Sequence, residues 1–469
     1  MARRKRIYNR KKGSSKGTLF VVLGLIFGGG AYMFTSPSFE RVDPVIESAE
    51  SLYWNRKEPL EITISDNMAL KSYSVQISDG KNSVRVADEL ILEPNKKLEV
   101  VKIEYPRKVI DGIMLNPKAK QFKVTVTATD RSNWNFFQGN SVTKNILVTI
   151  DYHRPDINIL SNSYSITQGG SALVVFQVRD ESLKNFYLRS GDKKFKVVPY
   201  KEDGYYASLV SWPFNQEHFS AKVVAEDMAG NKRIVNVPFY VVAKKYKTSW
   251  IKATDKFIDG KISDLAESNP QYLLIKDRID KLKAINEDMR KANEDLIHSL
   301  ASNISDKMIN SWHILPFYPL RNGKKVASYG DHRHYYYGKK SNEVSQSYHV
   351  GLDMASTKMA PIVSSNAGKV IFTDNNGIYG NMPMIDHGMG LFTLYGHCST
   401  ILVQQDQEIN AGTVIAKTGM TGLALGDHLH FGVLVQGIEV RPEEWMDKLW
   451  IKNNIDKVFN EADKIIDGK

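Results

Sequence analysis

With 469 residues and a formal net charge of +11, the chain is long enough for about three or four domains. Eight lysines and arginines lie at positions 3–16, before the first acidic residue; taking these 8 from +11 leaves a body charge of +3, so nucleic-acid binding has little support and no nucleic-acid partner is expected. The single cysteine, Cys398, excludes an intrachain disulfide.

Residues 1–36 predict a cytoplasmic basic tail followed by a membrane anchor. The uncharged apolar run from Gly17 to Phe34 has 18 residues, the short end of the length that spans a bilayer. By the positive-inside rule the basic flank stays in the cytoplasm, and everything after the run is exported. A cleaved signal peptide is the rival interpretation, but Gly30-Ala31-Tyr32-Met33 is a poor cleavage site. We therefore favour an uncleaved N-terminal transmembrane helix.

Residues 37–152 and 153–245 are each predicted to form an immunoglobulin-like β-sandwich. Short runs of β-branched and aromatic residues between turn residues are typical of strands, as at Leu60–Ile64, Tyr73–Ile77, Phe122–Thr127 and Val174–Val178. An internal repeat supports two copies, since Ile64-Ser65-Asp66 resembles Val178-Arg179-Asp180 at an offset of 114 residues. Likewise Ala128-Thr129-Asp130 resembles Ala225-Glu226-Asp227 at an offset of 97 residues. The simplest role is a spacer; binding of the cell wall or of a partner is the alternative.

Residues 246–312 change to a helical pattern. Apolar residues with charged residues between them keep an a/d-like spacing at Ile275, Ile279, Leu282, Met289, Leu296 and Leu300. Asn286 and Asn293 fall on the same stripe and weaken a long coiled coil, and Pro270 separates an earlier helical piece from Ile251 to Glu267. We predict a helical arm or hairpin that packs on a neighbouring domain. Protein partners that dock on the arm or the sandwiches are the alternative. Residues 451–469 predict a C-terminal helical tail.

The predicted domain at residues 313–450 carries the chemistry, in the five residues His349, Asp353, His397, His428 and His430. Two imidazoles and one carboxylate can hold zinc with an open fourth position, and two further histidines can act as general bases or as donors to developing charge. Leu429 and Phe431 alternate with the His-x-His pair, which predicts a buried strand with both imidazoles on one face. Gly351 and the nearby Pro361 favour a strand or loop for His349-x3-Asp353.

Other candidate ligands have a simpler interpretation. His332 and His334 form a second His-x-His in the tyrosine-rich segment GDHRHYYYG, which predicts a solvated loop or a substrate rim. His387 is expected to be a turn residue in IDHG, and Cys398 a bystander thiol.

From about Val326 to Trp445 the chain resembles the lysostaphin-type (LytM-domain) zinc peptidases, which cut peptidoglycan peptides. The matching segments are YHVGLDMA, SSNAGKVIFT, IYGNMPMIDHGMGLFTLYGHCS, INAGTVIAKTGMTG and GDHLHFGV. The resemblance implies a small, mostly antiparallel β domain with a groove across it. It also implies one Zn²⁺ per chain bound by His349, Asp353 and His430, with His397 and His428 as the catalytic histidines. Cys398 and Asp427 depart from the family pattern, where leucine and proline are common, and neither change removes a functional atom.

The resemblance therefore implies a membrane-anchored zinc endopeptidase that hydrolyses peptide cross-links of peptidoglycan. Zinc would activate water, and one of His397 and His428 would take its proton while the other stabilises the oxyanion or protonates the leaving amine. The expected location is the inner membrane, single-pass, with the catalytic part in the periplasm. The alternative is a non-catalytic LytM-like regulator that activates another cell-wall hydrolase, and the five intact positions count against it. The division of labour between the two histidines, the bond that is cut and any latency of the full chain stay open.

Overall fold

The computed structural model describes residues 15–468, so the predicted basic tail lies largely outside them. Helix α1 (Ser15–Thr35) covers the apolar run, and the short helix η1 (Pro37–Phe39) follows it. Among residues 15–468, no helix has both the length and the hydropathy that crossing a membrane requires. The predicted transmembrane helix is therefore not supported. The described chain is mainly β, in agreement with the sequence.

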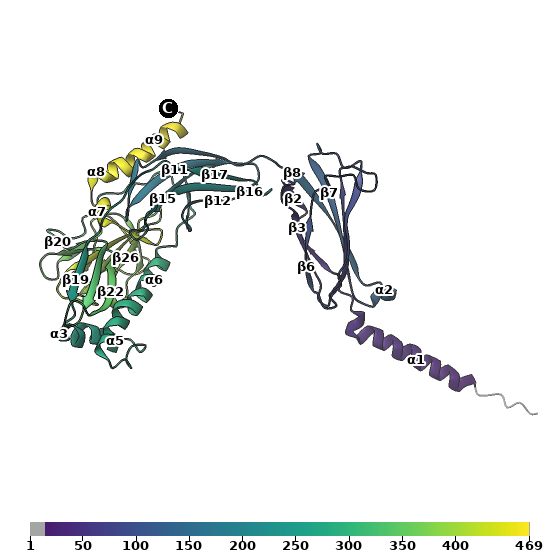
Figure 1. The fold of residues 1–469 in the computed structure, drawn as a ribbon, viewed down its shortest axis with the longest axis horizontal. Helices are drawn as coiled ribbons and strands as arrows, with labels where there is room; N and C mark the ends of the chain where they lie inside the picture. Colours follow the sequence, from purple (N-terminus) through teal and green to yellow (C-terminus); the bar gives the residue numbers. More distant parts are fainter. Residues whose placement is uncertain (1–14, 469) are drawn as a thin grey trace, which may run out of the picture. The chain divides into compact units, whose positions relative to one another are not determined.

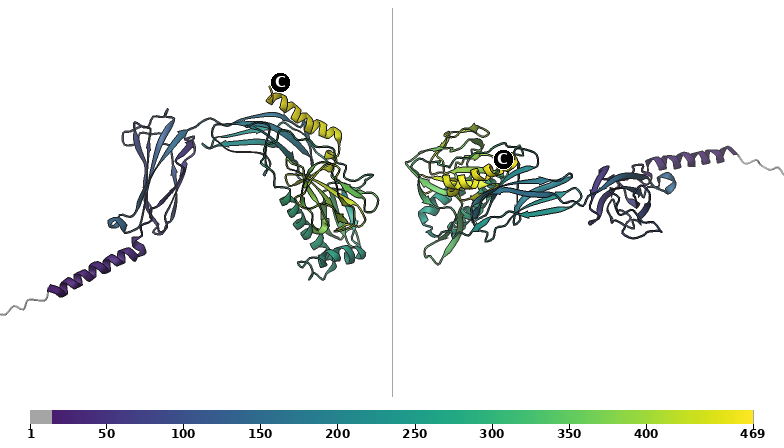
Figure 2. Two further views of the ribbon diagram at one scale, coloured as in Figure 1. Left: turned by 180° about the vertical axis from the view of Figure 1, so that it is seen from behind. Right: turned by 90° about the horizontal axis from the view of Figure 1, so that it is seen from above.

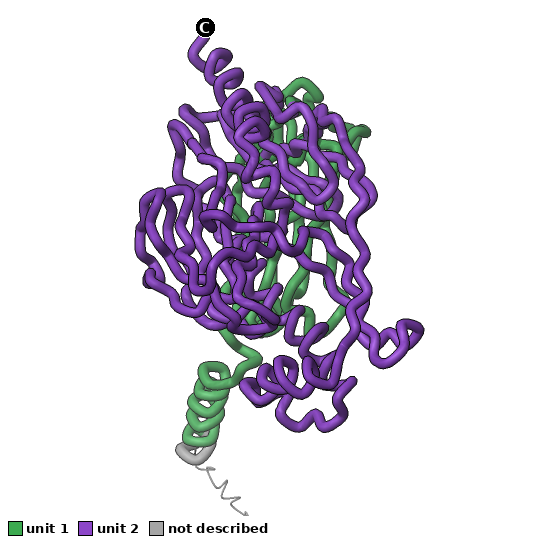
Figure 3. Tube along the Cα trace, turned by 90° about the vertical axis from the view of Figure 1, so that its left-hand side faces the viewer, with its two compact units in different colours: residues 1–153, 228–231 green, residues 154–227, 232–469 purple. Residues whose placement is uncertain are grey.

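The chain divides into two compact units (Figure 3), of which the first comprises residues up to 153 together with 228–231. Here a five-stranded sheet, in the order β2-β8-β7-β4-β5, encloses a core with the three-stranded sheet β1-β3-β6 (Figure 1). The strands are β1 (Val45–Glu47), β2 (Ser51–Trp54), β3 (Leu60–Ser65), β4 (Leu70–Ser78), β5 (Ser83–Leu90), β6 (Leu98–Ile103), β7 (Gln121–Asp130) and β8 (Ser141–Ile150), and α2 (Trp134–Phe137) precedes β8. Alternate residues of β7 are buried, because one face of the strand meets the core.

The second unit begins with a second pair of sheets. Each of them has four strands, in the orders β14-β15-β11-β9 and β13-β12-β16-β17. A short parallel pair, β10 with β18, lies beside them. The strands are β9 (Asp156–Asn162), β10 (Ser165–Thr167), β11 (Ser171–Arg179), β12 (Leu183–Ser190), β13 (Lys193–Phe195), β14 (Val198–Pro199), β15 (Tyr205–Ser211), β16 (Ala221–Asp227), β17 (Lys232–Asn236) and β18 (Tyr240–Val242).

The connection to the C-terminal region is a strand followed by helices. The elements are β19 (Thr248–Lys252), α3 (Asp255–Phe257), η2 (Ile258–Ile262), α4 (Ser263–Glu267), α5 (Arg278–Lys283), η3 (Ala284–Met289) and α6 (Arg290–Leu300). The sequence predicts a helical piece that begins at Ile251, but this start is wrong because Ile251 lies in β19. This strand pairs in parallel with a strand about 80 residues later in the chain. The helix proper begins after Thr254, whose side chain caps the Phe257 N–H.

The predicted helical stripe packs on the C-terminal region through both apolar and polar residues. Leu282 and Met289 of the stripe are buried, but Leu296 is exposed and its neighbour Ile297 is buried instead. Asn286 is also buried, and its amide donates to Ser345 Oγ at 2.9 Å. Asn293 accepts from the Ile378 N–H at 3.0 Å. The two asparagines that weaken a coiled coil therefore fasten this helix to a β domain.

The C-terminal region contains a long antiparallel sheet, in the order β20-β23-β31-β27-β26-β25-β29 with β32 beside β31, and two three-stranded sheets, β24-β30-β28 and β19-β21-β22. The elements are β20 (Lys324–Ala327), β21 (Asp331–Tyr336), β22 (Glu343–His349), β23 (Leu352–Ala355), β24 (Pro361–Val363), β25 (Gly368–Phe372), η4 (Gly377–Tyr379), β26 (Met384–Asp386), β27 (Leu391–Gly396), β28 (Thr400–Ile401), β29 (Glu408–Ile409), β30 (Val414–Lys417), β31 (Leu429–Val435), β32 (Ile438–Val440), α7 (Pro442–Trp445), α8 (Lys448–Ile451), η5 (Lys452–Asp456) and α9 (Lys457–Ile466).

The sandwich and the C-terminal region of this second unit share one hydrophobic core. Strand β11 is buried along both faces, as its continuous apolar sequence suggests. Val174 and Phe176 face the interior of the sandwich, whereas Leu173 and Val175 join the cluster that contains β27 and β31. The C-terminal helix α9 lies against β9 and β11 (Figure 2).

Gln436 lies in the tight turn between β31 and β32. Its side chain links the C-terminal region of this unit to the sandwich. Its Oε1 accepts from the Lys196 N–H at 2.7 Å, and its Nε2 donates to the carbonyls of Lys196 and Leu209 at 2.9 and 3.0 Å. Gln436 is 3% exposed, so these backbone groups are shielded from water.

Replacement of Gln436 by methionine keeps the length of the side chain and removes both hydrogen-bonding atoms. We expect the free energy of unfolding to fall by about 1–3 kcal/mol, because buried backbone groups lose their partners. Urea unfolding followed by tryptophan fluorescence measures the change, and Gln405→Met at an exposed position is the control. Equal midpoints for the two variants would contradict the role assigned to Gln436.

Candidate metal centre

Three adjacent strands bring the predicted site residues together. Strand β31 lies between β23 and β27, and in this register Asp353 of β23 lies directly opposite His430 of β31. His349 is the last residue of β22 and reaches the same point across the turn into β23. Leu429 and Phe431 are fully buried. His428 and His430 therefore share the opposite face, as the two-residue period of a strand requires.

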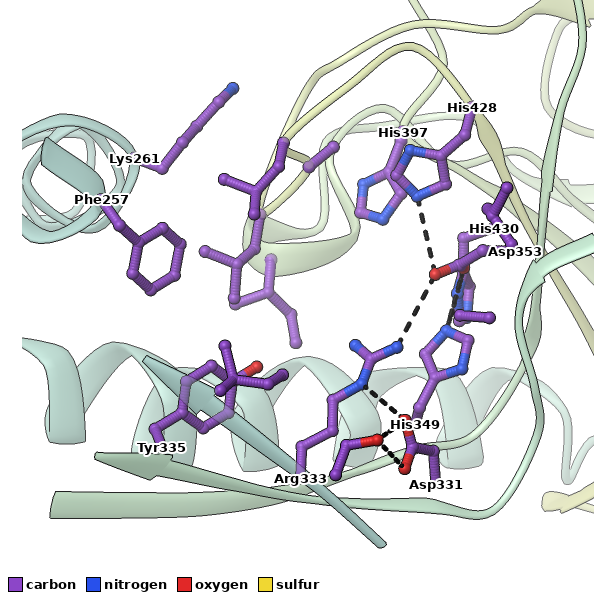
Figure 4. A pocket seen from close by; sticks show the side chains of 18 of the residues that line it. Phe257, Lys261, Asp331, Arg333, Tyr335, His349, Asp353, His397, His428 and His430 are labelled. Carbon is purple, nitrogen blue, oxygen red and sulfur yellow. Dashed lines mark hydrogen bonds and ion pairs between the residues drawn. The ribbon is translucent and has the colours of Figure 1, made fainter. Parts of the chain in front are cut away.

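His349, Asp353 and His430 form a buried cluster that could hold a metal ion (Figure 4). His349 Nε2 lies 2.9 Å from Asp353 Oδ1 and 3.1 Å from His430 Nδ1. His430 Nδ1 lies 2.8 Å from the same Asp353 oxygen. Three donor atoms thus meet from three side chains. The structure brings these predicted ligands together, and their role as ligands stays a prediction.

The chemistry of these donors fits zinc. His349 Nδ1 lies 2.8 Å from the carbonyl of Ser328, which can only accept, so Nδ1 carries the proton and the Nε2 lone pair faces the cluster. That lone pair faces a carboxylate oxygen and a second ring nitrogen, an arrangement that either a proton on His430 Nδ1 or a bound cation satisfies. Donors at about 2.0–2.2 Å from a tetrahedral zinc lie about 3.3–3.6 Å from one another, so these three donor atoms, 2.8–3.1 Å apart, need only move slightly outward to hold the ion.

The side chains of the cluster shift one another's pKa values. Burial opposes ionisation of Asp353, but His349 and His430 outweigh it and hold the pKa of Asp353 well below its usual value. Burial lowers the pKa of His430 to about 4, against the opposing effect of Asp353. The carboxylate is therefore ionised and His430 is neutral near pH 7, and these are the forms that bind a metal ion.

His397 and His428 lie next to this cluster with their ring centroids 4.8 Å apart. His397 follows β27 with a φ of 65°, a conformation that is uncommon for a residue other than glycine and that is found at functional sites. Its Nδ1 bonds the carbonyl of Thr421 at 2.9 Å, and His428 Nδ1 bonds that of Gly426 at 2.7 Å. Because carbonyls only accept, both rings hold their proton on Nδ1 and leave Nε2 as a free base.

The two histidines differ in burial. Burial, reinforced by the neighbouring His430 and His428, lowers the pKa of His397 to about 3. The His428 side chain is 14% exposed, and its Nε2 lies 3.8 Å from Asp353 Oδ2. His397 is therefore firmly neutral near pH 7.

All five residues line one groove of about 1040 Å³. On one side, β19, α3 and η2 form a wall, and Lys261 of this wall donates to the Met420 carbonyl at 2.7 Å. Arg333 of β21 enters the groove and lies 3.5 Å from Asp331 and 3.8 Å from Asp353 (Figure 4). The groove thus combines the His-Asp-His cluster with cationic side chains.

Sequence analysis missed Arg333, Lys261 and Tyr379. The ring of Tyr379 is fully buried, 5.4 Å from that of His430, and its carbonyl accepts from the His397 N–H at 2.7 Å. Each of these residues reaches the site through contacts that are distant in sequence. In the segment HRH the pattern draws attention to the two histidines, and nothing local marks Arg333 as a residue of the groove.

The other candidate ligands lie elsewhere. His332 and His334 are not in a loop: they belong to β21, which pairs with β19 and β22, and their rings stack on Tyr348 and Trp250. His387 is a buried residue bonded to the Ala367 carbonyl and to Thr393 Oγ1, both at 2.8 Å. Cys398 is fully buried, which raises the pKa of its thiol to about 12. Asp427 accepts from Thr418 Oγ1 and the Met359 N–H, away from the histidines.

Comparison with known proteins gives a family match in the C-terminal region. Residues 347–442 match the model of peptidase family M23. The DD-carboxypeptidase/endopeptidase Mpg of Neisseria meningitidis is 37% identical over 94 residues, 20% of this chain and 22% of the relative. The murein hydrolase activator NlpD of Salmonella dublin is 36% identical over 98 residues, 20% of this chain and 26% of the relative. The chain thus spans about a quarter or less of the length of these curated relatives.

A crystal structure of an M23 peptidase from Pseudomonas aeruginosa covers 60% of this chain and 94% of its own, at 20% identity and a TM-score of 0.36. The matched residues 347–442 include the five predicted site residues that line the groove, which are His349, Asp353, His397, His428 and His430. The C-terminal part of the chain is a peptidase family M23 domain of the LytM type.

Proposed function

We propose that this chain is a zinc endopeptidase that hydrolyses the peptide cross-links of peptidoglycan. One observation carries the proposal: a His-Asp-His cluster and two histidines with free Nε2 atoms line the same groove. The Neisseria relative is a DD-carboxypeptidase/endopeptidase and the Salmonella relative a murein hydrolase activator. Both names point to the cell wall as the substrate class.

Zinc is the metal that suits this donor set, because two imidazoles and one carboxylate leave a fourth position for a reactant. Held by His349, Asp353 and His430, zinc would polarise the scissile carbonyl and make water nucleophilic at neutral pH. The Ser328 carbonyl orients the first imidazole through Nδ1, as second-shell partners do in zinc sites.

His397 and His428 would move the protons. Each keeps its Nδ1–H on a backbone carbonyl and offers Nε2 to the groove, so each can accept a proton from the attacking water. The protonated ring can then stabilise the oxyanion or pass its proton to the leaving amine. His428 is the more exposed of the two and lies closer to a carboxylate oxygen that would stabilise its charged form.

The groove suits an extended, partly anionic peptide. Its volume is large enough for several residues, and Arg333 and Lys261 place cationic groups along it. Arg333 makes only long contacts to Asp331 and Asp353, which leaves donors for a substrate carbonyl or carboxylate. A wall substrate implies action outside the cytoplasm, and the inner-membrane anchor and the periplasmic location remain predictions.

The alternative is a regulator that activates another cell-wall hydrolase, as the Salmonella relative does by name. All five expected site residues are present in this chain, and the residues of the groove are arranged for proton transfer. These features favour catalysis.

The proposed activity is tested directly with cross-linked muropeptides. Incubation with the full chain should convert dimers to monomers, and a zinc chelator should stop the conversion because Lewis-acid assistance is lost. Mass spectrometry of the products identifies the bond that is cut. A zinc-loaded protein that leaves dimers intact but accelerates another hydrolase would favour the regulator.

Removing a ligand and removing a base should have different effects. His430→Ala should abolish stoichiometric zinc binding, because the cluster loses one of its three protein donors. His397→Ala should keep zinc and reduce turnover by about 10²–10⁴-fold, the usual contribution of a positioned acid or base. Elemental analysis of the purified variants, together with muropeptide turnover, measures both. Zinc retained by His430→Ala at wild-type stoichiometry would contradict the ligand assignment.

Gly351 is the position at which a single methyl group should disturb the cluster. A Cβ there would lie 2.4 Å from Cε1 and Nε2 of His430 and 3.0 Å from the Phe431 carbonyl. Gly351→Ala should therefore displace the imidazole and weaken zinc binding by about 10–100-fold, comparable to the loss of a second-shell partner. Competition with a chromophoric chelator measures the affinity.

The matched control is Gly426→Ala, in the loop before His428, where a Cβ meets nothing within 4 Å. This variant should bind zinc like the natural chain. Equal zinc affinities for the two alanine variants would show that the ring of His430 does not depend on the space at Gly351.

A further inference from the structure

A second group of oxygen atoms lies in the first unit, at the end of the sandwich where the chain enters it. Glu40, Asp66 and Asp130 each place a carboxylate oxygen within 4.8 Å of the others. Asp66 follows β3, Asp130 ends β7, and Glu40 lies just before β1. Among the described residues, no lysine or arginine pairs with any of these three carboxylates. Three acids have therefore been brought together without a protein cation.

One oxygen of this group is buried and has no partner. Asp66 is 7% exposed. Its Oδ2 accepts from the N–H groups of Met68 and Ala69, both at 2.7 Å. Its Oδ1 is buried without a hydrogen-bond partner among the described residues. A buried carboxylate oxygen with no partner is costly unless a donor or a cation meets it.

Too many oxygens also surround the amide of Asn140. Its Nδ2 lies 2.7 Å from Asp130 Oδ2, 3.1 Å from the Glu40 carbonyl, 3.3 Å from Glu40 Oε1 and 3.5 Å from the Val42 carbonyl. An amide has two hydrogens, so four acceptors exceed what it can satisfy. Carboxylate and carbonyl oxygens of the segment Glu40–Val42 and of Asp130 thus lie close together around this amide, and not all of them can be satisfied by it.

We propose that Glu40, Asp66 and Asp130, with the carbonyls of Glu40 and Val42, form a binding site for a calcium ion. Calcium takes six to eight oxygen ligands, including carboxylates and backbone carbonyls, in flexible geometry. Zinc prefers nitrogen and sulfur donors, and magnesium demands a regular octahedron and retains several waters. The all-oxygen set with three carboxylates therefore fits calcium best.

The internal repeat places a pair of aspartates at equivalent positions of the two sandwiches. Asp66 lies between β3 and β4 and Asp130 ends β7, and in the second sandwich Asp180 lies between β11 and β12 and Asp227 ends β16. In both copies the first aspartate accepts from a backbone N–H two residues later, at 2.7 Å. The pair thus belongs to the module and is independent of the groove of the M23 domain.

Bound calcium would fasten the entering segment, Glu40–Val42, to the loops that follow β3 and β7. The carboxylate oxygens of Glu40, Asp66 and Asp130 lie within 4.8 Å of one another. These carboxylates repel one another without an ion, and calcium removes the repulsion. The first sandwich should therefore be more stable, and its N-terminal segment better ordered, when calcium is bound.

Isothermal titration of the full chain with CaCl₂, after dialysis against calcium-free buffer, tests the site. We expect one site with a dissociation constant of about 10⁻⁴–10⁻³ M, the range of extracellular calcium modules, and a higher thermal midpoint with calcium than with MgCl₂. No binding heat and no thermal shift up to about 10 mM CaCl₂, ten times the weakest affinity in that range, would overturn the proposal.

Asp66→Asn is the diagnostic variant, because an amide oxygen can still accept from Met68 and Ala69 while the negative charge is lost. It should weaken calcium binding about tenfold or more, since affinity follows ligand charge. Glu40→Gln, at a partly exposed position, should do the same and serves if Asp66→Asn fails to fold.

Asp88→Asn is the control within the first unit, because Asp88 is exposed and pairs with Arg85. His430→Ala is the control for the M23 domain. Both should bind calcium like the natural chain. Unchanged calcium affinity in both Asp66→Asn and Glu40→Gln would overturn the assignment, and neither result depends on peptidase activity.

Discussion

The register of β31 between β23 and β27 is the constraint on which the candidate site depends. It places His430 opposite Asp353 on one side and opposite Gly396, just before His397, on the other. A slip by one residue would turn both histidines of the His-x-His pair into the core and bring Leu429 and Phe431 to the groove. Leu429 and Phe431 are fully buried, so the apolar packing behind the strand fixes which face carries the imidazoles.

The second sandwich strengthens this register from behind. Leu173, Val175 and Leu209 belong to the same core as Val433 and Leu434 of β31. The turn that follows β31 is held by Gln436, whose amide bonds Lys196 and Leu209 of the sandwich. A strand anchored at its end and packed behind cannot shift easily, and preorganised side chains of this kind are what metal binding and proton transfer require.

The sequence alone predicts those features of the site that depend on local structure. Strand periodicity predicts that His428 and His430 share a face, and Gly351 with Pro361 correctly argued against a helix for His349 and Asp353. The roles of these residues came from a family resemblance, not from spacing. Local patterns also predict strands in both sandwiches, at Leu60–Ile64, Tyr73–Ile77, Phe122–Thr127 and Val174–Val178, because their alternating and β-branched residues are continuous in sequence.

Contacts between distant segments could not be predicted in this way. Ile251 was assigned to a helix, yet it forms a parallel strand with β21, a pairing that only the complete fold provides. The same pairing orders His332 and His334 in a strand and directs Arg333 into the groove. The continuous apolar sequence of β11 predicts a strand that is buried on both faces. This pattern does not predict which segment packs against its second face.

The two proposed ion sites differ in chemistry, and this difference would let one chain select two metals. The cluster in the M23 domain offers two nitrogens and one carboxylate, a set that binds zinc and leaves a position open for chemistry. The group in the first sandwich offers only oxygens from carboxylates and carbonyls, a set suited to calcium, which has no marked preference for nitrogen. Donor softness therefore separates the sites. In the proposed assignment zinc would serve reactivity in the M23 domain, and calcium would serve the stiffness of the module that precedes it.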